Sequence, residues 1–192
     1  MRELFKILAR LKSEQYDGIR IIKALWEKKI TDRADVNVIS RSNSGEKSFS
    51  QANAGAGPNV IKDNRRFLVC EAVFRGERLC VTMLKIPDGI KILGVIPEND
   101  NTEGWLSQTE LTGFLAEVGD NNSIHRGDNP VVPGMLLLER IKKELPSDVN
   151  RMELSFRNAV YLWDKPVFSI EGNHFALQGR EVFVTGNFSC DD

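Results

Sequence analysis

A helix whose first turn is apolar on every side is the feature that most constrains the fold of this sequence. Residues 135–138 are Met-Leu-Leu-Leu and follow the Pro-Gly pair at 133–134, so apolar side chains surround one full helical turn. This turn has no side to leave in water, and other elements must enclose it. Three segments with the apolar and β-branched content of strands follow at 151–162, 165–177 and 180–189. The sequence therefore predicts an α+β unit in which a curled antiparallel sheet surrounds a central helix.

The first hundred residues show a similar order of elements. Apolar residues recur at helical spacing over 3–11, and a second helix is expected over 18–29. Strands are expected at 35–40, 66–74, 77–86 and 89–96. The Gly, Ser, Ala and Asn content of 43–59 predicts a loop, and 97–104 has the composition of a linker.

Three pairs of segments suggest an internal duplication. Residues 3–11 can be overlaid on 110–118 at an offset of 107 residues. Gly18 and the residues after it match Gly134 and the residues after it at an offset of 116, and 76–82 match 179–185 at an offset of 103. These matches predict a degenerate N-terminal half over 1–97 and a C-terminal half over 105–192. The rise from 107 to 116 means that the first copy lacks about nine residues, which in the second copy contain His125. The alternative is one domain with a helical extension.

Composition excludes several classes of partner. The chain has 26 Lys and Arg against 27 Asp and Glu, with no long basic run, so no nucleic-acid partner is expected. No segment approaches the length of a membrane span and the N-terminal residues do not resemble a secretory signal, which predicts a cytoplasmic protein with no membrane partner. The three cysteines lack CxxC spacing, so neither a disulfide framework nor a metal site is expected.

The segment 119–141, GDNNSIHRGDNPVVPGMLLLERI, carries the chemistry. The segment resembles the β-hydroxyacyl-carrier-protein dehydratases in the order and spacing of His125, Pro130, the Pro133-Gly134 pair and Glu139. Glu139 follows His125 by 14 positions. Its stretch 119–125 also resembles the Gly-Asp-x-Asn-Pro-x-His motif of the MaoC-like R-specific enoyl-CoA hydratases, with Ser123 in place of the proline. The resemblance covers about residues 105–192.

That resemblance implies a hotdog fold, as a double hotdog if the first half is a degenerate copy. It implies a hydro-lyase that hydrates or dehydrates a 3-hydroxyacyl/2-enoyl thioester in fatty acid or polyketide metabolism. The substrate would be carried on coenzyme A or on the phosphopantetheine of an acyl carrier protein, and no metal or redox cofactor is needed. Pairing of hotdog units is expected either within the chain or in a homodimer. An acyl thioesterase and a non-catalytic acyl-binding or partner subunit are the alternative functions.

The chemistry needs two protic groups and a site for negative charge. His125 is a candidate base, and Asp120 or Glu139 is a candidate second group. The backbone N–H of Gly134, at the start of the helix, can receive charge from the thioester oxygen. Each carboxylate also has a structural interpretation: Asp120 as the cap of a turn, and Glu139 as the partner of Arg140 or Lys143.

Which carboxylate works with His125 depends on how the hotdog units pair. If the halves pair within the chain, the overlay of Gly18 on Gly134 puts Lys23 at the position equivalent to Glu139, and a lysine cannot replace an acid. Asp120 with His125 is then expected. If two chains pair through their second halves, His125 with Glu139 is expected.

Overall fold

The computed structural model describes residues 1–11, 17–29, 57–85 and 105–190. In this part of the chain, eight strands form one antiparallel sheet in the order β2-β3-β4-β1-β5-β8-β7-β6. The elements are α1 (Arg2–Leu8), β1 (Arg20–Lys28), β2 (Asn59–Asp63), β3 (Phe67–Phe74), β4 (Glu77–Leu84), α2 (Gln108–Val118), η2 (Ser123–His125), α3 (Gly134–Glu144), β5 (Val149–Phe156), β6 (Val167–Glu171), β7 (His174–Gln178) and β8 (Val182–Cys190).

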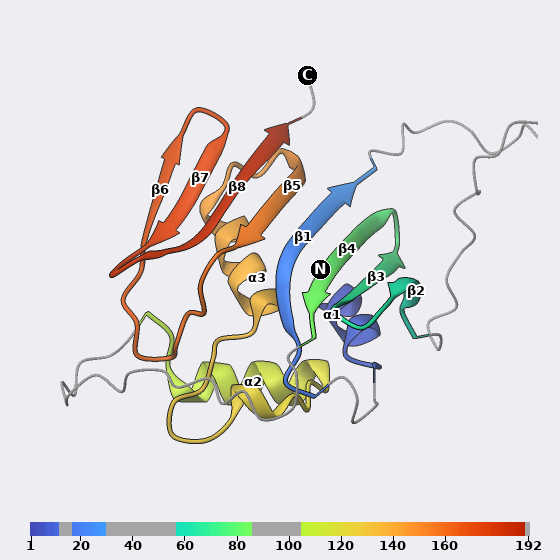
Figure 1. Cartoon of the computed structure of the whole chain (residues 1–192). Coiled ribbons are helices and arrows are strands. Elements are labelled where there is room, and N and C mark those ends of the chain that lie inside the picture. The colour runs from blue at the N-terminus through green and yellow to red at the C-terminus, as the bar shows by residue number, and fades with distance from the viewer. Residues whose placement is uncertain (12–16, 30–56, 86–104, 191–192) are drawn as a thin grey trace, which may run out of the picture.

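The order of the strands is symmetric about the centre of the sheet. β1 and β5 pair with each other, and outward from them the order is β4, β3, β2 on one side and β8, β7, β6 on the other. Figure 1 shows α3 in the half formed by β5–β8, α1 in the half formed by β1–β4, and α2 at one end of the sheet. The two halves therefore have matching strand arrangements.

The apolar helix is enclosed as its sequence predicts. Five residues of α3 are buried: Met135, Leu136, Leu137, Leu138 and Ile141. The preceding helix α2 begins at a capping box, in which Ser107 and Glu110 bond each other's backbone N–H, and ends at Gly119 with a φ of 74°. A left-handed residue of this kind ends a helix and redirects the chain. Here it turns the chain into the loop that carries His125.

The predicted helix over 18–29 is wrong, because these residues form β1. Ala24 and Trp26 alternate as buried residues along the strand, and β1 bonds both β4 and β5. Pairing on both edges outweighs the helical propensity of its Lys, Ala, Leu and Glu residues. The overlay of Gly18 on Gly134 is therefore wrong, and so is the equivalence of Lys23 with Glu139. Lys23 lies in a strand, opposite Thr82 and Ser155.

The other predicted strands agree with the structure more closely. The hairpin predicted over 66–86 is β3 and β4, which turn at Arg75 and Gly76, both with positive φ. The segment 165–177 forms two strands, β6 and β7, because the chain turns at Gly172. The segment 76–82 covers the start of β4, and the segment 179–185 leads into β8. These two strands occupy matching places in the sheet. The strands expected at 35–40 and 89–96, most of the 43–59 loop and the 97–104 linker lie outside the described residues.

Among the helices that the structure describes, none has the length and apolar content needed to cross a bilayer.

Candidate active site

His125 ends the single 3₁₀ turn η2, between α2 and α3, and is 7% exposed. The turn is joined to the chain that precedes β1. Asn122 accepts a hydrogen bond from the N–H of Gly18 at 2.9 Å and donates one to the carbonyl of Ile19 at 2.9 Å. The N–H of Ser123 donates to Asp17 at 2.8 Å. The histidine loop is therefore fixed by hydrogen bonds to the segment that leads into β1, in the other half of the molecule.

The hydrogen bonds of the imidazole fix its tautomer. Nδ1 of His125 lies 2.7 Å from the carbonyl oxygen of Val131, which can only accept, so Nδ1 carries the proton. Nε2 then has a free lone pair in the neutral ring. It lies 3.6 Å from Oδ2 of Asp120, whose other oxygen accepts a bond from the N–H of Asn122 at 3.0 Å. The structure thus brings together two of the predicted site residues, Asp120 and His125, and both side chains are largely buried.

Burial lowers the pKa of His125 below its ordinary value, and it outweighs the opposing effects of Asp120 and of the Val131 hydrogen bond. Arg126 and Arg20 contribute further in the same direction as burial. The ring is therefore neutral at pH 7, with Nε2 ready to accept a proton. A base in this state suits proton abstraction.

The lowered pKa predicts how activity changes with pH. A base whose neutral form is active gains activity as pH rises through its pKa, so kcat/KM should rise with a midpoint below about 6.5 and stay level through neutrality. An NMR titration of the His125 ring measures the same pKa without substrate. A midpoint above the ordinary value, by either method, would contradict the neutral-base assignment.

A cavity of about 820 Å³ lies beside the pair. His125, Asp120 and Gly134 line it together with apolar side chains from both halves: Leu8, Ile21, Val81, Met83, Leu137 and Phe156. Charged and polar residues line it as well, among them Asp17, Arg20 and Arg157, and its size is typical of a site for a small organic ligand. His125 also borders a second hollow of about 410 Å³ on the side of α2.

Gly134 occupies the predicted place at the start of α3. The carbonyl of Pro133 accepts bonds from the N–H groups of Leu136 and Leu137, so the N–H groups of Gly134 and Met135 have no acceptor within the helix. A Cβ atom at Gly134 would lie 3.2 Å from Cβ of Ile21 on β1. The glycine therefore allows the start of α3 to lie close against the first half of the sheet.

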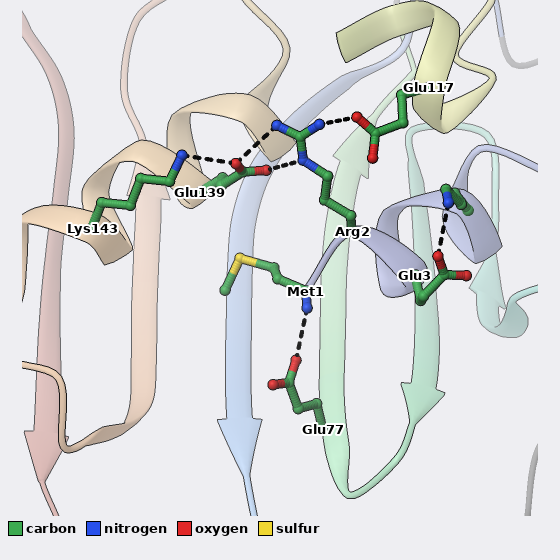
Figure 2. Close-up of polar contacts among 8 residues, drawn as sticks. Met1, Arg2, Glu3, Glu77, Glu117, Glu139 and Lys143 are labelled. Atoms are coloured by element: carbon green, nitrogen blue, oxygen red, sulfur yellow. Dashed lines mark hydrogen bonds and ion pairs between the residues drawn. The ribbon is translucent and has the colours of Figure 1, made fainter.

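Glu139 is turned toward another set of partners (Figure 2). Arg2 donates to both of its oxygens, at 2.9 and 3.0 Å, and Lys143 lies 3.1 Å from one of them. Arg2 also bonds Glu117 on α2. Burial would raise the pKa of Glu139, but the bonds from Arg2 and Lys143 together lower it, so the carboxylate is ionised. Glu139 is not among the residues that line the cavity, and the described chain does not bring it to His125.

Of the two structural partners expected for Glu139, Lys143 is present and Arg140 is not. Arg140 instead bonds Glu110 and the carbonyl of Trp105. Sequence reasoning missed Arg2, which lies 137 positions from Glu139, and Arg20, which lines the cavity from β1. No spacing rule connects residues so distant, and Arg20 fell in a segment predicted to be a helix.

Comparisons with known proteins establish the class of fold. No family model and no curated protein matches the chain. Among solved structures it is similar to HtdX from Mycobacterium tuberculosis, with a TM-score of 0.51 and 13% identity over 91% of this chain and 78% of that one. A MaoC-like dehydratase from Phytophthora capsici also matches, with a TM-score of 0.47 and 12% identity over 94% of this chain and 72% of that one. The likeness to HtdX is one of fold alone, and a large antiparallel sheet with a few helices fits an α+β hotdog fold.

Proposed function

We propose that the protein catalyses the reversible hydration or dehydration of a 3-hydroxyacyl/2-enoyl thioester. The observation that carries this proposal is the neutral imidazole of His125 beside the carboxylate of Asp120 at the wall of a cavity of about 820 Å³. Moving water across the α,β bond requires one proton transfer at Cα and another at the β-oxygen. Two adjacent proton-accepting groups meet that requirement.

In the dehydration direction, Nε2 of His125 accepts the proton from Cα of the 3-hydroxyacyl group. The negative charge that develops on the thioester oxygen is received at the start of α3, where the N–H of Gly134 and the helix dipole favour an anion. The Cβ–O bond breaks and the hydroxyl leaves as water, taking a proton that passes from His125 through Asp120. One proton enters the pair and one leaves, so both groups return to their starting states.

The chain is further proposed to be a double hotdog, with halves 1–97 and 105–192. The symmetric strand order supports this arrangement, as do the matching places of β4 and β8. Only the second half carries a His loop, and the first half closes the cavity around it. Pairing within the chain favours Asp120 over Glu139 as the partner of His125. The alternative, two chains paired through their second halves, would require Glu139 to exchange Arg2 and Lys143 for the histidine of another chain.

The proposed substrate is an acyl thioester on coenzyme A or an acyl carrier protein, handled in the cytoplasm without a metal or redox cofactor. Incubation of the purified protein with crotonyl-CoA or 3-hydroxybutyryl-CoA, followed by the absorbance of the conjugated enoyl group, tests the reaction. Loss or gain of that absorbance supports it. Release of free thiol would indicate a thioesterase instead. Binding of thioesters without turnover at any chain length would indicate the non-catalytic alternative.

A matched pair of variants distinguishes the two carboxylates. Asp120→Asn keeps the size and the turn but removes a proton acceptor, and it should lower kcat/KM by about 10²-fold. Glu139→Gln should leave kcat/KM near the wild-type value, because Glu139 lies outside the cavity. It should lower the free energy of unfolding by about 1 kcal/mol, since Arg2 is partly exposed and its ion pair is screened. A larger loss of activity in Glu139→Gln than in Asp120→Asn would reverse the assignment.

A further inference from the structure

Arg20 places a guanidinium in the wall of the cavity that contains His125 and Asp120. Its Nε and Nη2 atoms are both buried, and neither has a hydrogen-bond partner among the residues that the structure describes. These two nitrogens form one edge of the planar guanidinium, the edge that binds both oxygens of a carboxylate in parallel. The cavity therefore contains an unused site for a planar anion.

The nearby carboxylates do not occupy that edge. Asp17 and Asp120 line the same cavity, but Asp17 accepts from the N–H of Ser123 and Asp120 accepts from the N–H of Asn122. Tyr161 forms a side-chain hydrogen bond with Arg20, and this bond uses neither Nε nor Nη2. Arg20 is half-buried, and a partly desolvated cation with no carboxylate on this edge among the described residues costs free energy that a bound anion would offset.

We infer that Arg20 binds a carboxylate on the acyl part of the substrate, so that the preferred substrate is the monothioester of a short dicarboxylic acid. The inference rests on the proposed function for the thioester itself. Arg20 and His125 line the same cavity, and the charge of Arg20 is among the causes that lower the pKa of His125. The second carboxylate should accordingly lie only a few bonds from Cβ. Apolar side chains in the lining, such as Ile21, Val81 and Met83, accommodate the methylene groups between the two ends, and Arg157 is a second arginine in the lining.

Two enoyl thioesters of matched shape test the preference. Glutaconyl-CoA is crotonyl-CoA with a carboxylate on its terminal carbon. Wild-type protein should hydrate glutaconyl-CoA with a kcat/KM at least about tenfold higher than crotonyl-CoA, because one charge-assisted bidentate contact is added. Arg20→Met should lower the ratio of kcat/KM for glutaconyl-CoA to kcat/KM for crotonyl-CoA by about 10- to 100-fold. Equal losses on both substrates would overturn the inference, since Arg20 would then serve the thioester and not a carboxylate.

A binding measurement separates this inference from the proposed reaction. Glutaryl-CoA and butyryl-CoA are saturated and cannot be hydrated, so calorimetric titration reports recognition alone. Wild-type protein should bind glutaryl-CoA more tightly than butyryl-CoA, and Arg20→Met should bind the two equally. Selective binding of glutaryl-CoA without hydration of any enoyl thioester would contradict the proposed reaction and support the anion site at Arg20. Hydration of crotonyl-CoA without preferential binding of glutaryl-CoA would support the proposed reaction and contradict the anion site. If the circular dichroism spectrum shows that Arg20→Met does not fold, Arg20→Gln is measured in its place, because glutamine keeps a polar side chain at this position.

Discussion

Replacing His125 with alanine should lower kcat/KM for crotonyl-CoA hydration by about 10²- to 10⁴-fold, the range that a positioned general base contributes. The imidazole is held by the carbonyl of Val131 and faces Asp120 through Nε2. Alanine removes the proton acceptor and leaves Asp120 without a partner for transfer. The enoyl absorbance assay measures the loss directly.

His174 provides a matched control, because it is the only other histidine in the sequence. It begins β7, is exposed, and contacts Asn187 through Nδ1 at 2.6 Å. His174→Ala should therefore leave kcat/KM unchanged. A circular dichroism spectrum of His125→Ala should match the wild type, which separates lost chemistry from lost folding. Full turnover by a folded His125→Ala protein would remove the proposed mechanism.

Replacing Trp26 with alanine should lower the free energy of unfolding by about 3–5 kcal/mol, the usual cost of removing a large buried aromatic side chain. Trp26 is fully buried in β1, its Nε1 lies 3.4 Å from Glu77, and the ammonium of Lys142 on α3 lies 3.8 Å from its ring centre. It therefore packs against elements of both halves. Since a domain is stable by only about 5–15 kcal/mol, the variant should lie close to unfolding at room temperature.

Urea titration of the wild type, Trp26→Phe and Trp26→Ala measures this effect. Phenylalanine fills most of the same space, so its cost should be well below that of alanine. The midpoints should therefore fall in the order wild type, phenylalanine, alanine. A cost below about 1 kcal/mol for alanine, the usual effect of a single substitution, would show that Trp26 is not central to the seam between β1 and β5.

The second half of the fold was predictable from its sequence because its signals are local. The Pro-Gly start and four consecutive apolar residues define α3, and the spacing within 119–134 places a histidine loop next to it. His125 and Gly134, both named as candidate site residues from the sequence, line the same cavity. Such patterns need only the neighbours along the chain.

The first half was less predictable because its structure depends on distant partners. β1 has the composition of a helix, and its strand state comes from pairing with β4 and β5. The same error hid Arg20, whose guanidinium reaches the cavity only because β1 is a strand at the centre of the sheet. The contact of Arg2 with Glu139 likewise depends on how α1 and α3 meet, which no periodicity in the sequence reports.

Asn122 accepts a hydrogen bond from Gly18 and donates one to Ile19, and Ser123 donates one to Asp17, so the two halves of the molecule have different roles at the site. The second half supplies the imidazole, while the first half supplies the backing for its loop and one wall of the adjoining hollow. Substitutions in the strand that begins at Arg20 can accordingly alter which molecules are accepted without touching the reacting groups. An ancestral scaffold of this design could acquire new specificities by drift in one half while the other kept its chemistry constant.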